Sequence, residues 1–130
     1  MLRACLTALA PALSLLLLIG LLSIAPAAAG GPAGSADVTL NGEVVDMACY
    51  VAQGGKGEMH RPCAAKCAKM GQPVGLLSGD GSIYLLVADH VDVAPYEKAR
   101  GLAGEQVVIR GGVAEKDGIS TLTVHEARKK

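Results

Sequence analysis

The sequence predicts a mainly β domain: a small five-stranded OB-like antiparallel barrel. A cysteine-bearing helix is inserted after strand 1, and a short helix lies between strands 3 and 4. Three observations predict this fold: five alternating or apolar segments, two glycine-containing turns that suit hairpins, and two helical patterns between the strands. Five strands with a helix between the third and fourth follow the order of an OB-fold barrel. The same elements also allow an open antiparallel sheet with two helices on one face.

The first strand is indicated by alternation of apolar and polar residues. In "DVTLNGEVVD", Val38, Leu40 and Val44 alternate with polar side chains, which is typical of a half-buried strand. The segments "MACYVAQ" and "GGKGE" follow, and we interpret them as a connection whose glycines make it mobile.

The cysteine helix is expected from about Arg61 to Met70 in "HRPCAAKCAKM". Pro62 suits the first helical turn, where its missing N–H has no helical partner to lose. Gly71 suits the residue after the helix, and Pro73 prevents the helix from continuing.

The remaining strands are predicted as two hairpins. Gly79-Asp80-Gly81 separates two apolar runs, and Asp117-Gly118 is a favoured two-residue hairpin turn. Gly111-Gly112 within the last hairpin indicates a bulge or bend that suits a barrel corner. Between the hairpins, Pro95 can open a short helix and Gly104 can follow its end.

The N-terminal segment has the features of a secretory signal peptide. Arg3 precedes a leucine-rich run, and Ala27-Ala28-Ala29 fits an A-x-A cleavage site. We therefore expect cleavage near Ala29 and a periplasmic or secreted protein. The alternative is a membrane anchor formed by residues 4–29, because this uncharged run is long enough to span a bilayer.

The expected organisation is a signal peptide at 1–29, a flexible leader at 30–37, a single OB-like domain at 38–126 and a tail at 127–130. The chain has a formal net charge of zero, three tyrosines, and neither Trp nor Phe. Single-stranded nucleic-acid binding needs stacking aromatics in a basic groove, so we expect no nucleic-acid partner. The expected partners are a metal ion or a periplasmic or secreted protein, and a membrane only if the N-terminal segment is not cleaved.

Cleavage would leave three cysteines: Cys49, Cys63 and Cys67. Export implies an oxidising compartment, and an odd count leaves one thiol over unless a metal takes all three. With His60 at zero on a helical wheel, Cys63 and Cys67 lie at about 300° and 340°, on the same face. We therefore expect Cys49 to meet the cysteine helix.

The combination favours a soft transition metal. Cys49, His60, Cys63 and Cys67 would form a Cys3His set, which is a tetrahedral zinc arrangement. Thiolates and thioethers also suit Cu(I), with Met70 and Met59 as further ligands.

Two alternatives remain open. The domain could be a non-enzymatic OB-like binding module in which a pair from Cys49, Cys63 and Cys67 is a structural disulfide. It could also be a thiol-disulfide redox protein, although C-x3-C is not the usual C-x-x-C spacing. A Cys–His nucleophile would need a third orienting group, and none is identifiable, so an enzyme is not favoured and no catalytic residue is assigned.

Two segments also carry a resemblance. The stretch "GEVVDMACY…HRPCAAKCAKMGQPVGLLSGDGSIYLL" resembles a group of small exported bacterial OB-fold-like proteins with a cysteine-bearing helical insertion after the first strand. The stretch "LAGEQVVIRGGVAEKDGISTLTV" is similar to the last two strands of OB-fold-like domains in secreted bacterial proteins. Together they cover residues 38–126. The resemblance implies a fold and an exported location, and it carries no functional residue over.

Overall fold

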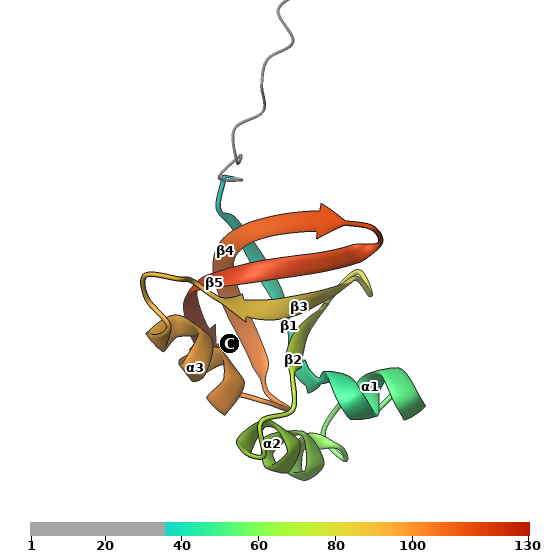
Figure 1. The fold of residues 1–130 in the computed structure, drawn as a ribbon. Helices are drawn as coiled ribbons and strands as arrows, with labels where there is room; N and C mark the ends of the chain where they lie inside the picture. The colour runs from blue at the N-terminus through green and yellow to red at the C-terminus, as the bar shows by residue number, and fades with distance from the viewer. Residues whose placement is uncertain (1–35) are drawn as a thin grey trace, which may run out of the picture. The chain divides into compact units, whose positions relative to one another are not determined.

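The computed structural model describes residues 36–130. The expected signal peptide, residues 1–29, and residues 30–35 of the leader lie outside this part of the chain. The five strands are β1 (Val38–Asp46), β2 (Val74–Ser78), β3 (Ile83–Ala88), β4 (Gln106–Lys116) and β5 (Ile119–Lys129). They form a closed barrel in the order β1-β2-β3-β5-β4 (Figure 1). The predicted OB-like barrel is confirmed, and the open sheet was the wrong alternative.

Strand β1 closes the barrel because it pairs with both β2 and β4. Its first half lies antiparallel to β4, with Leu40 opposite Ile109, and its second half lies antiparallel to β2, with Val44 opposite Leu76. Strands β3 and β5 form a parallel pair, and the other ladders are antiparallel. Each of the five strands therefore pairs with a neighbour on both sides, so the barrel has no free edge strand.

The barrel interior is aliphatic, as expected for a chain without Phe or Trp. Leu76, Ile109, Leu122 and Val124 are fully buried, together with Val44 from β1. Burying each such side chain stabilises the fold by about 1.5–3 kcal/mol relative to an exposed position.

The last hairpin shows both features that its glycines predict. Asp117 and Gly118 have φ values of 52° and 81°, and these positive angles suit a two-residue hairpin turn. A register shift lies between Arg110 and Gly111. A Cβ at Gly111 would lie 1.8 Å from the Thr123 carbonyl oxygen, so only glycine allows the two strands to approach this closely.

Three helices accompany the barrel: α1 (Met47–Gln53), α2 (Arg61–Lys69) and α3 (Ala94–Gly101). Helices α2 and α3 confirm the two predicted helices. Helix α1 was not expected, because its segment was interpreted as part of a connection. It forms because the Asp46 side chain accepts a hydrogen bond from the Cys49 N–H at 2.9 Å, and it ends at Gly54, whose φ is 70°.

The glycine-rich loop after α1 is fastened to the barrel. Glu43 is only 7% exposed, and its carboxylate accepts the Gly57 N–H at 2.7 Å. The sequence analysis expected a mobile loop and did not predict this hydrogen bond to a buried carboxylate. A buried carboxylate with a charge-assisted hydrogen bond holds the connection close to β1.

Both ends of the described domain differ slightly from the expected boundaries. Strand β5 continues to Lys129, and Ala127 is buried opposite Ile109, so the expected tail at 127–130 belongs almost entirely to the barrel. At the other end, Asp37 from the expected leader accepts a hydrogen bond from Arg110 and lies 2.8 Å from the His125 ring. Within residues 36–130, no helix has the length and apolar character needed to cross a membrane.

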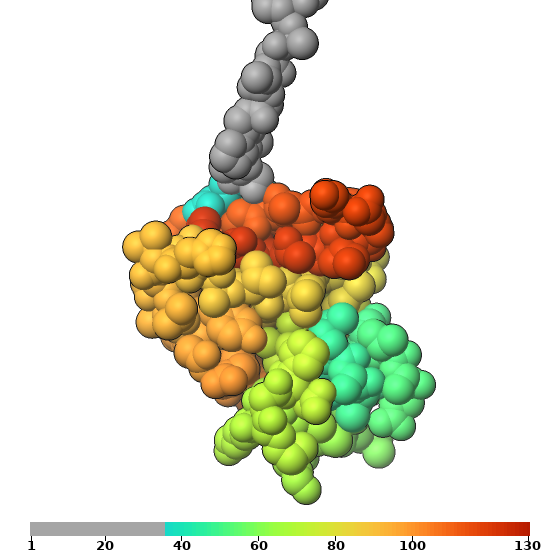
Figure 2. Space-filling view, viewed as in Figure 1, coloured from blue at the N-terminus to red at the C-terminus, as the bar shows by residue number. Residues whose placement is uncertain are grey.

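Residues 47–73, here called the insertion, carry α1 and α2. The insertion leaves and rejoins the barrel at neighbouring positions, because Asp46 on β1 pairs with Val74 on β2. Ala64 and Ala68 on α2 are each 2% exposed and join the hydrophobic core. Figure 2 shows the insertion projecting below the barrel strands. The small side chains of Ala64 and Ala68 thus let α2 pack closely against the hydrophobic core, while the rest of the helix lies outside the core.

Candidate metal centre

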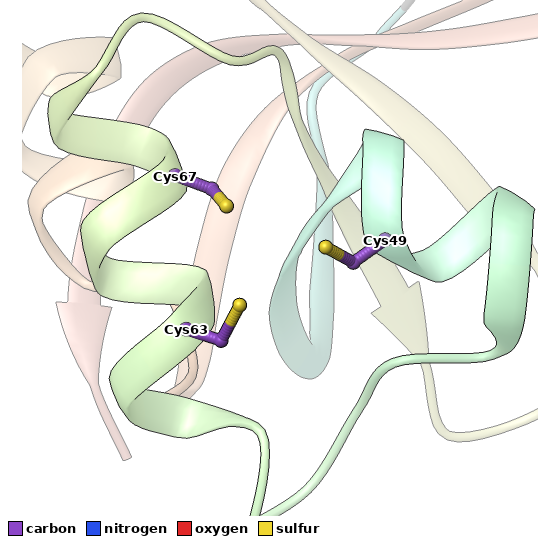
Figure 3. Close-up of side chains that lie close together, drawn as sticks. All are labelled: Cys49, Cys63 and Cys67. Carbon is purple, nitrogen blue, oxygen red and sulfur yellow. The ribbon is translucent and has the colours of Figure 1, made fainter.

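The three cysteines of the domain converge between α1 and α2. Their Sγ atoms all lie within 4.8 Å of one another, and each thiol is free. In Figure 3, Cys63 and Cys67 point from α2 toward Cys49 on α1. The predicted convergence of Cys49 with the cysteine helix is confirmed.

Local sequence explains why α2 presents two thiols together. Cys63 and Cys67 are four residues apart, so they lie on one face, one turn above the other. Ala64 and Ala68 have the same spacing and occupy the buried face. The alanine pair therefore sets the rotation of α2, and this rotation presents the cysteines to α1.

Cys49 reaches the cluster through the cap of α1. The Asp46 side chain binds its backbone N–H and so fixes the first turn of the helix directly after β1. Asp46 is completely buried, and its second carboxylate oxygen lies 3.1 Å from His60 Nε2. The sequence analysis assigned no role to Asp46. The available signal was a capping residue before "MACYVAQ" and a glycine after it.

His60 lies beside the thiol cluster, held by Asp46. Its ring packs against Gly55, where an added Cβ would lie 2.6 Å from Nε2. Asp46, Cys49 and His60 offer ligand atoms within 4.8 Å of one another, but His60 does not join the group of three cysteines. The four predicted ligands therefore lie in two groups that share Cys49.

The two least exposed thiols hold their protons tightly. Burial, reinforced by the hydrogen bond and charge of Asp46, raises the pKa of Cys49 to about 11. Burial also raises the pKa of Cys67, with a further contribution from its hydrogen bond to Cys63. Both groups are thiols at neutral pH, so a metal must displace protons to bind thiolates here.

The side of the cluster formed by Cys63 is open to solvent. Cys63 is exposed, whereas Cys49 and Cys67 are half-buried. The two suggested thioether ligands are also on the surface, with Met59 98% exposed and Met70 63% exposed. The cluster thus has a buried side, next to Asp46, and a solvent-exposed side, formed by Cys63.

The other two histidines, His90 and His125, lie outside both groups of ligand atoms. His90 is exposed in the loop after β3. The His125 ring lies between two carboxylates, 2.8 Å from Asp37 and 3.6 Å from Asp89. In residues 36–130, groups of three or more His, Cys, Asp or Glu ligand atoms gather only around Cys49.

Comparison with known proteins identifies no relative of this chain. The sequence matches no family model, no curated protein and no solved structure. The cysteine cluster on an OB-like barrel is therefore the feature from which function can be inferred.

Proposed function

We propose that the protein is a small exported protein that binds a soft transition metal, Cu(I) or Zn(II), through Cys49, Cys63 and Cys67. One observation carries the proposal: two separate helices bring three Sγ atoms within 4.8 Å of one another. Thiolates are the ligands that these ions prefer. His60, which the sequence also suggested as a ligand, is paired with Asp46 beside the cluster.

The number of converging thiols favours a metal over a structural disulfide. A disulfide uses two sulfurs and gives the third no reason to lie at the same point. Cys63 and Cys67 share one helix face, where side chains four residues apart do not point at each other well enough for an S–S bond. One ion can bind all three sulfurs.

The low acidity of Cys49 and Cys67 disfavours disulfide exchange with either of these two thiols as the attacking group. Exchange requires a thiolate as the attacking group. The raised pKa values of Cys49 and Cys67 leave few thiolates at these two positions at neutral pH. A metal ion stabilises the thiolate directly, so it can bind at these positions by displacing the protons.

Competition titration tests the proposal. Reduced protein is titrated with Cu(I) or Zn(II) against a chelator of known affinity, with Cys63→Ser as the variant and Ala65→Ser, on the same helix, as the matched control. Losing a direct ligand should weaken binding by more than the roughly 10–100-fold typical of an outer-shell partner. The control should bind like wild type. Less than one ion per chain for both metals, or equal binding by wild type and Cys63→Ser, would reject the proposal.

The pH dependence provides a second readout of the same site. Each thiol that binds as a thiolate releases a proton, so affinity should fall as pH decreases. The raised pKa values of Cys49 and Cys67 should extend this dependence through neutral pH to alkaline pH. A flat affinity between pH 6 and about 9 would show that the thiols are not the ligands.

Export is a separate part of the proposal. It is supported by Arg3, the leucine-rich run and the Ala27-Ala28-Ala29 site. Cell fractionation followed by intact-mass measurement should give a chain that begins near Gly30. A full-length species in the membrane fraction would support the anchored alternative.

A further inference from the structure

We propose that the Asp46–His60 pair makes the centre selective for Zn(II): Asp46 holds Nε2 of the His60 ring, and Nδ1 is the fourth ligand beside the three cysteine sulfurs. This inference rests on the proposed metal-binding function. It names the metal, completes the ligand set, and assigns Asp46 as a positioning residue that acts through His60.

The first observation is which ring nitrogen of His60 is already used. Nε2 lies 3.1 Å from a carboxylate oxygen of Asp46. A carboxylate accepts hydrogen bonds, so Nε2 carries the hydrogen and donates it. In a neutral imidazole the other nitrogen then has a free lone pair, which is the form that binds a metal. The contact with Asp46 therefore prepares Nδ1 as a ligand atom.

The second observation is that Asp46 is suited to hold a ligand and not to be one. It is completely buried, and while one oxygen faces His60, the other accepts the Cys49 N–H at 2.9 Å. Binding a metal itself would break the cap of α1. A metal-binding histidine commonly donates its second ring N–H to a carboxylate, which fixes the tautomer and the ring orientation. Asp46 fits this outer position, and it also fixes the helical turn that carries Cys49.

The third observation places His60 on the same helix face as two of the thiols. Its φ and ψ of −93° and −11° are helical, and its carbonyl oxygen accepts the Ala64 N–H at 2.9 Å. His60 therefore continues the geometry of α2, although the helix begins one residue later. Residues three and seven positions apart share one face of a helix, so His60 lies on the face of Cys63 and Cys67.

The distances allow a tetrahedral site to close around one ion. The three Sγ atoms lie within 4.8 Å of one another, and a ring nitrogen of His60 lies within 4.8 Å of the Cys49 Sγ. With Zn–S at about 2.3 Å and Zn–N at about 2.0 Å, the ligand atoms of a tetrahedral site lie roughly 3.5–4 Å apart. His60 is not within 4.8 Å of all three sulfurs, so we expect the ion to draw α1 and α2 together.

The donor set selects between the two candidate metals. Zn(II) is almost always four-coordinate in closed sites, and three thiolates with one imidazole are a known zinc set. Cu(I) prefers soft sulfur ligands, which the three cysteines supply without an imidazole. Loss of the His60 ring should therefore weaken zinc binding much more than copper binding.

Proton–nitrogen correlation spectra of the histidine rings test the assigned nitrogen in the unmodified protein. Before zinc is added, we expect the ring hydrogen of His60 on Nε2. One equivalent of Zn(II) should shift the Nδ1 resonance while Nε2 keeps its hydrogen. His90 and His125 lie outside the cluster, so their rings are internal controls and should not shift. Stoichiometric zinc binding that leaves the His60 ring unchanged, or that shifts Nε2 as the bound nitrogen, would overturn the inference.

Competition titrations of two variants test the selectivity. His60→Gln keeps an N–H that can donate to Asp46 but lacks the ring nitrogen, so Zn(II) affinity should fall more than about 100-fold and Cu(I) affinity less than about tenfold. His125→Gln is the matched control and should bind both ions like wild type. Equal losses for the two ions, or unchanged zinc binding by His60→Gln, would contradict the inference. A wild-type protein that binds neither ion would instead overturn the proposed function.

Asp46→Asn separates positioning from folding. The cap of α1 needs the amide oxygen, so the amide NH2 would face Nε2 and favour the hydrogen on Nδ1. Zn(II) affinity should then fall by about 10–100-fold, as for other outer-shell partners, and the ring spectrum should show the other tautomer. Asp92→Asn is the control and should change neither. Wild-type zinc affinity in a folded Asp46→Asn protein would remove Asp46 from the site.

Discussion

Replacing Asp46 with alanine should strongly destabilise the domain before any metal is added. Asp46 caps α1 through the Cys49 N–H at 2.9 Å and pairs with His60 at 3.1 Å. Loss of a helix cap costs about 1 kcal/mol. Loss of a hydrogen bond to a charged group costs about 1.5–3 kcal/mol. The expected decrease in the free energy of unfolding is therefore about 2.5–4 kcal/mol.

Thermal and urea unfolding followed by circular dichroism would measure this loss. In a domain of this size, 1 kcal/mol shifts Tm by about 4–8 °C, so Asp46→Ala should lower Tm by about 10–30 °C. Asp46→Asn keeps a good capping residue and removes only the charge, so its loss should be smaller. Asp92→Ala is the matched control, because Asp92 is exposed and binds one backbone N–H at 3.0 Å near the start of α3.

The control should lose no more than about 1 kcal/mol, as expected for one exposed hydrogen bond. The reasoning fails if Asp46→Ala and Asp92→Ala destabilise equally. It also fails if Asp46→Asn is as damaging as Asp46→Ala, because the cap would then contribute nothing.

Three further predictions follow from other parts of the domain. Burial raises the pKa of Cys49 from 9.0 to about 11, so the folded state favours the neutral thiol. The free energy of unfolding of the reduced, metal-free protein should therefore be constant below pH 9 and decrease between pH 9 and 11. Urea midpoints of Cys49→Ser should vary less over that range. The hydrogen bond from Lys129 lowers the pKa of Glu105 below its ordinary 4.5, so stability should fall as pH decreases below 4.5, and Glu105→Gln should weaken that dependence; identical acid profiles would contradict it. Gly111→Ala should cost at least about 2 kcal/mol because its Cβ would collide with the facing strand, whereas Gly79→Ala, with open space around it, should unfold within about 1 kcal/mol of wild type.

The parts of the fold that were predictable have local signals. The turn at Asp117-Gly118 needs positive φ at both residues, and the sequence places suitable residues there. Helix α2 begins at the expected residue and ends one residue before the expected end, because Pro62 and Gly71 act within one turn. The meeting of Cys49 with Cys63 and Cys67 followed from the odd number of cysteines rather than from any local pattern.

The parts that could not be predicted depend on contacts between distant segments. Helix α1 is short, and its seven residues have no apolar periodicity, so only its two ends identify it. Asp46 is buried because β1 pairs with β2 and the loop carrying His60 covers it from 14 residues away. Pairing of His60 with Asp46 instead of with all three sulfurs is therefore a property of the assembled insertion.

The pairing of Asp46 with Val74 at the base of the insertion has a consequence for local opening. Because the chain leaves and returns at one hydrogen-bonded position, the segment from 47 to 73 can unfold while the five strands stay paired. All three thiols lie within that segment, so an ion that joins them restricts this partial opening first. Amide exchange should then slow in α1 and α2 on metal loading, while the slowest-exchanging amides of β4 and β5 report on global unfolding of the barrel.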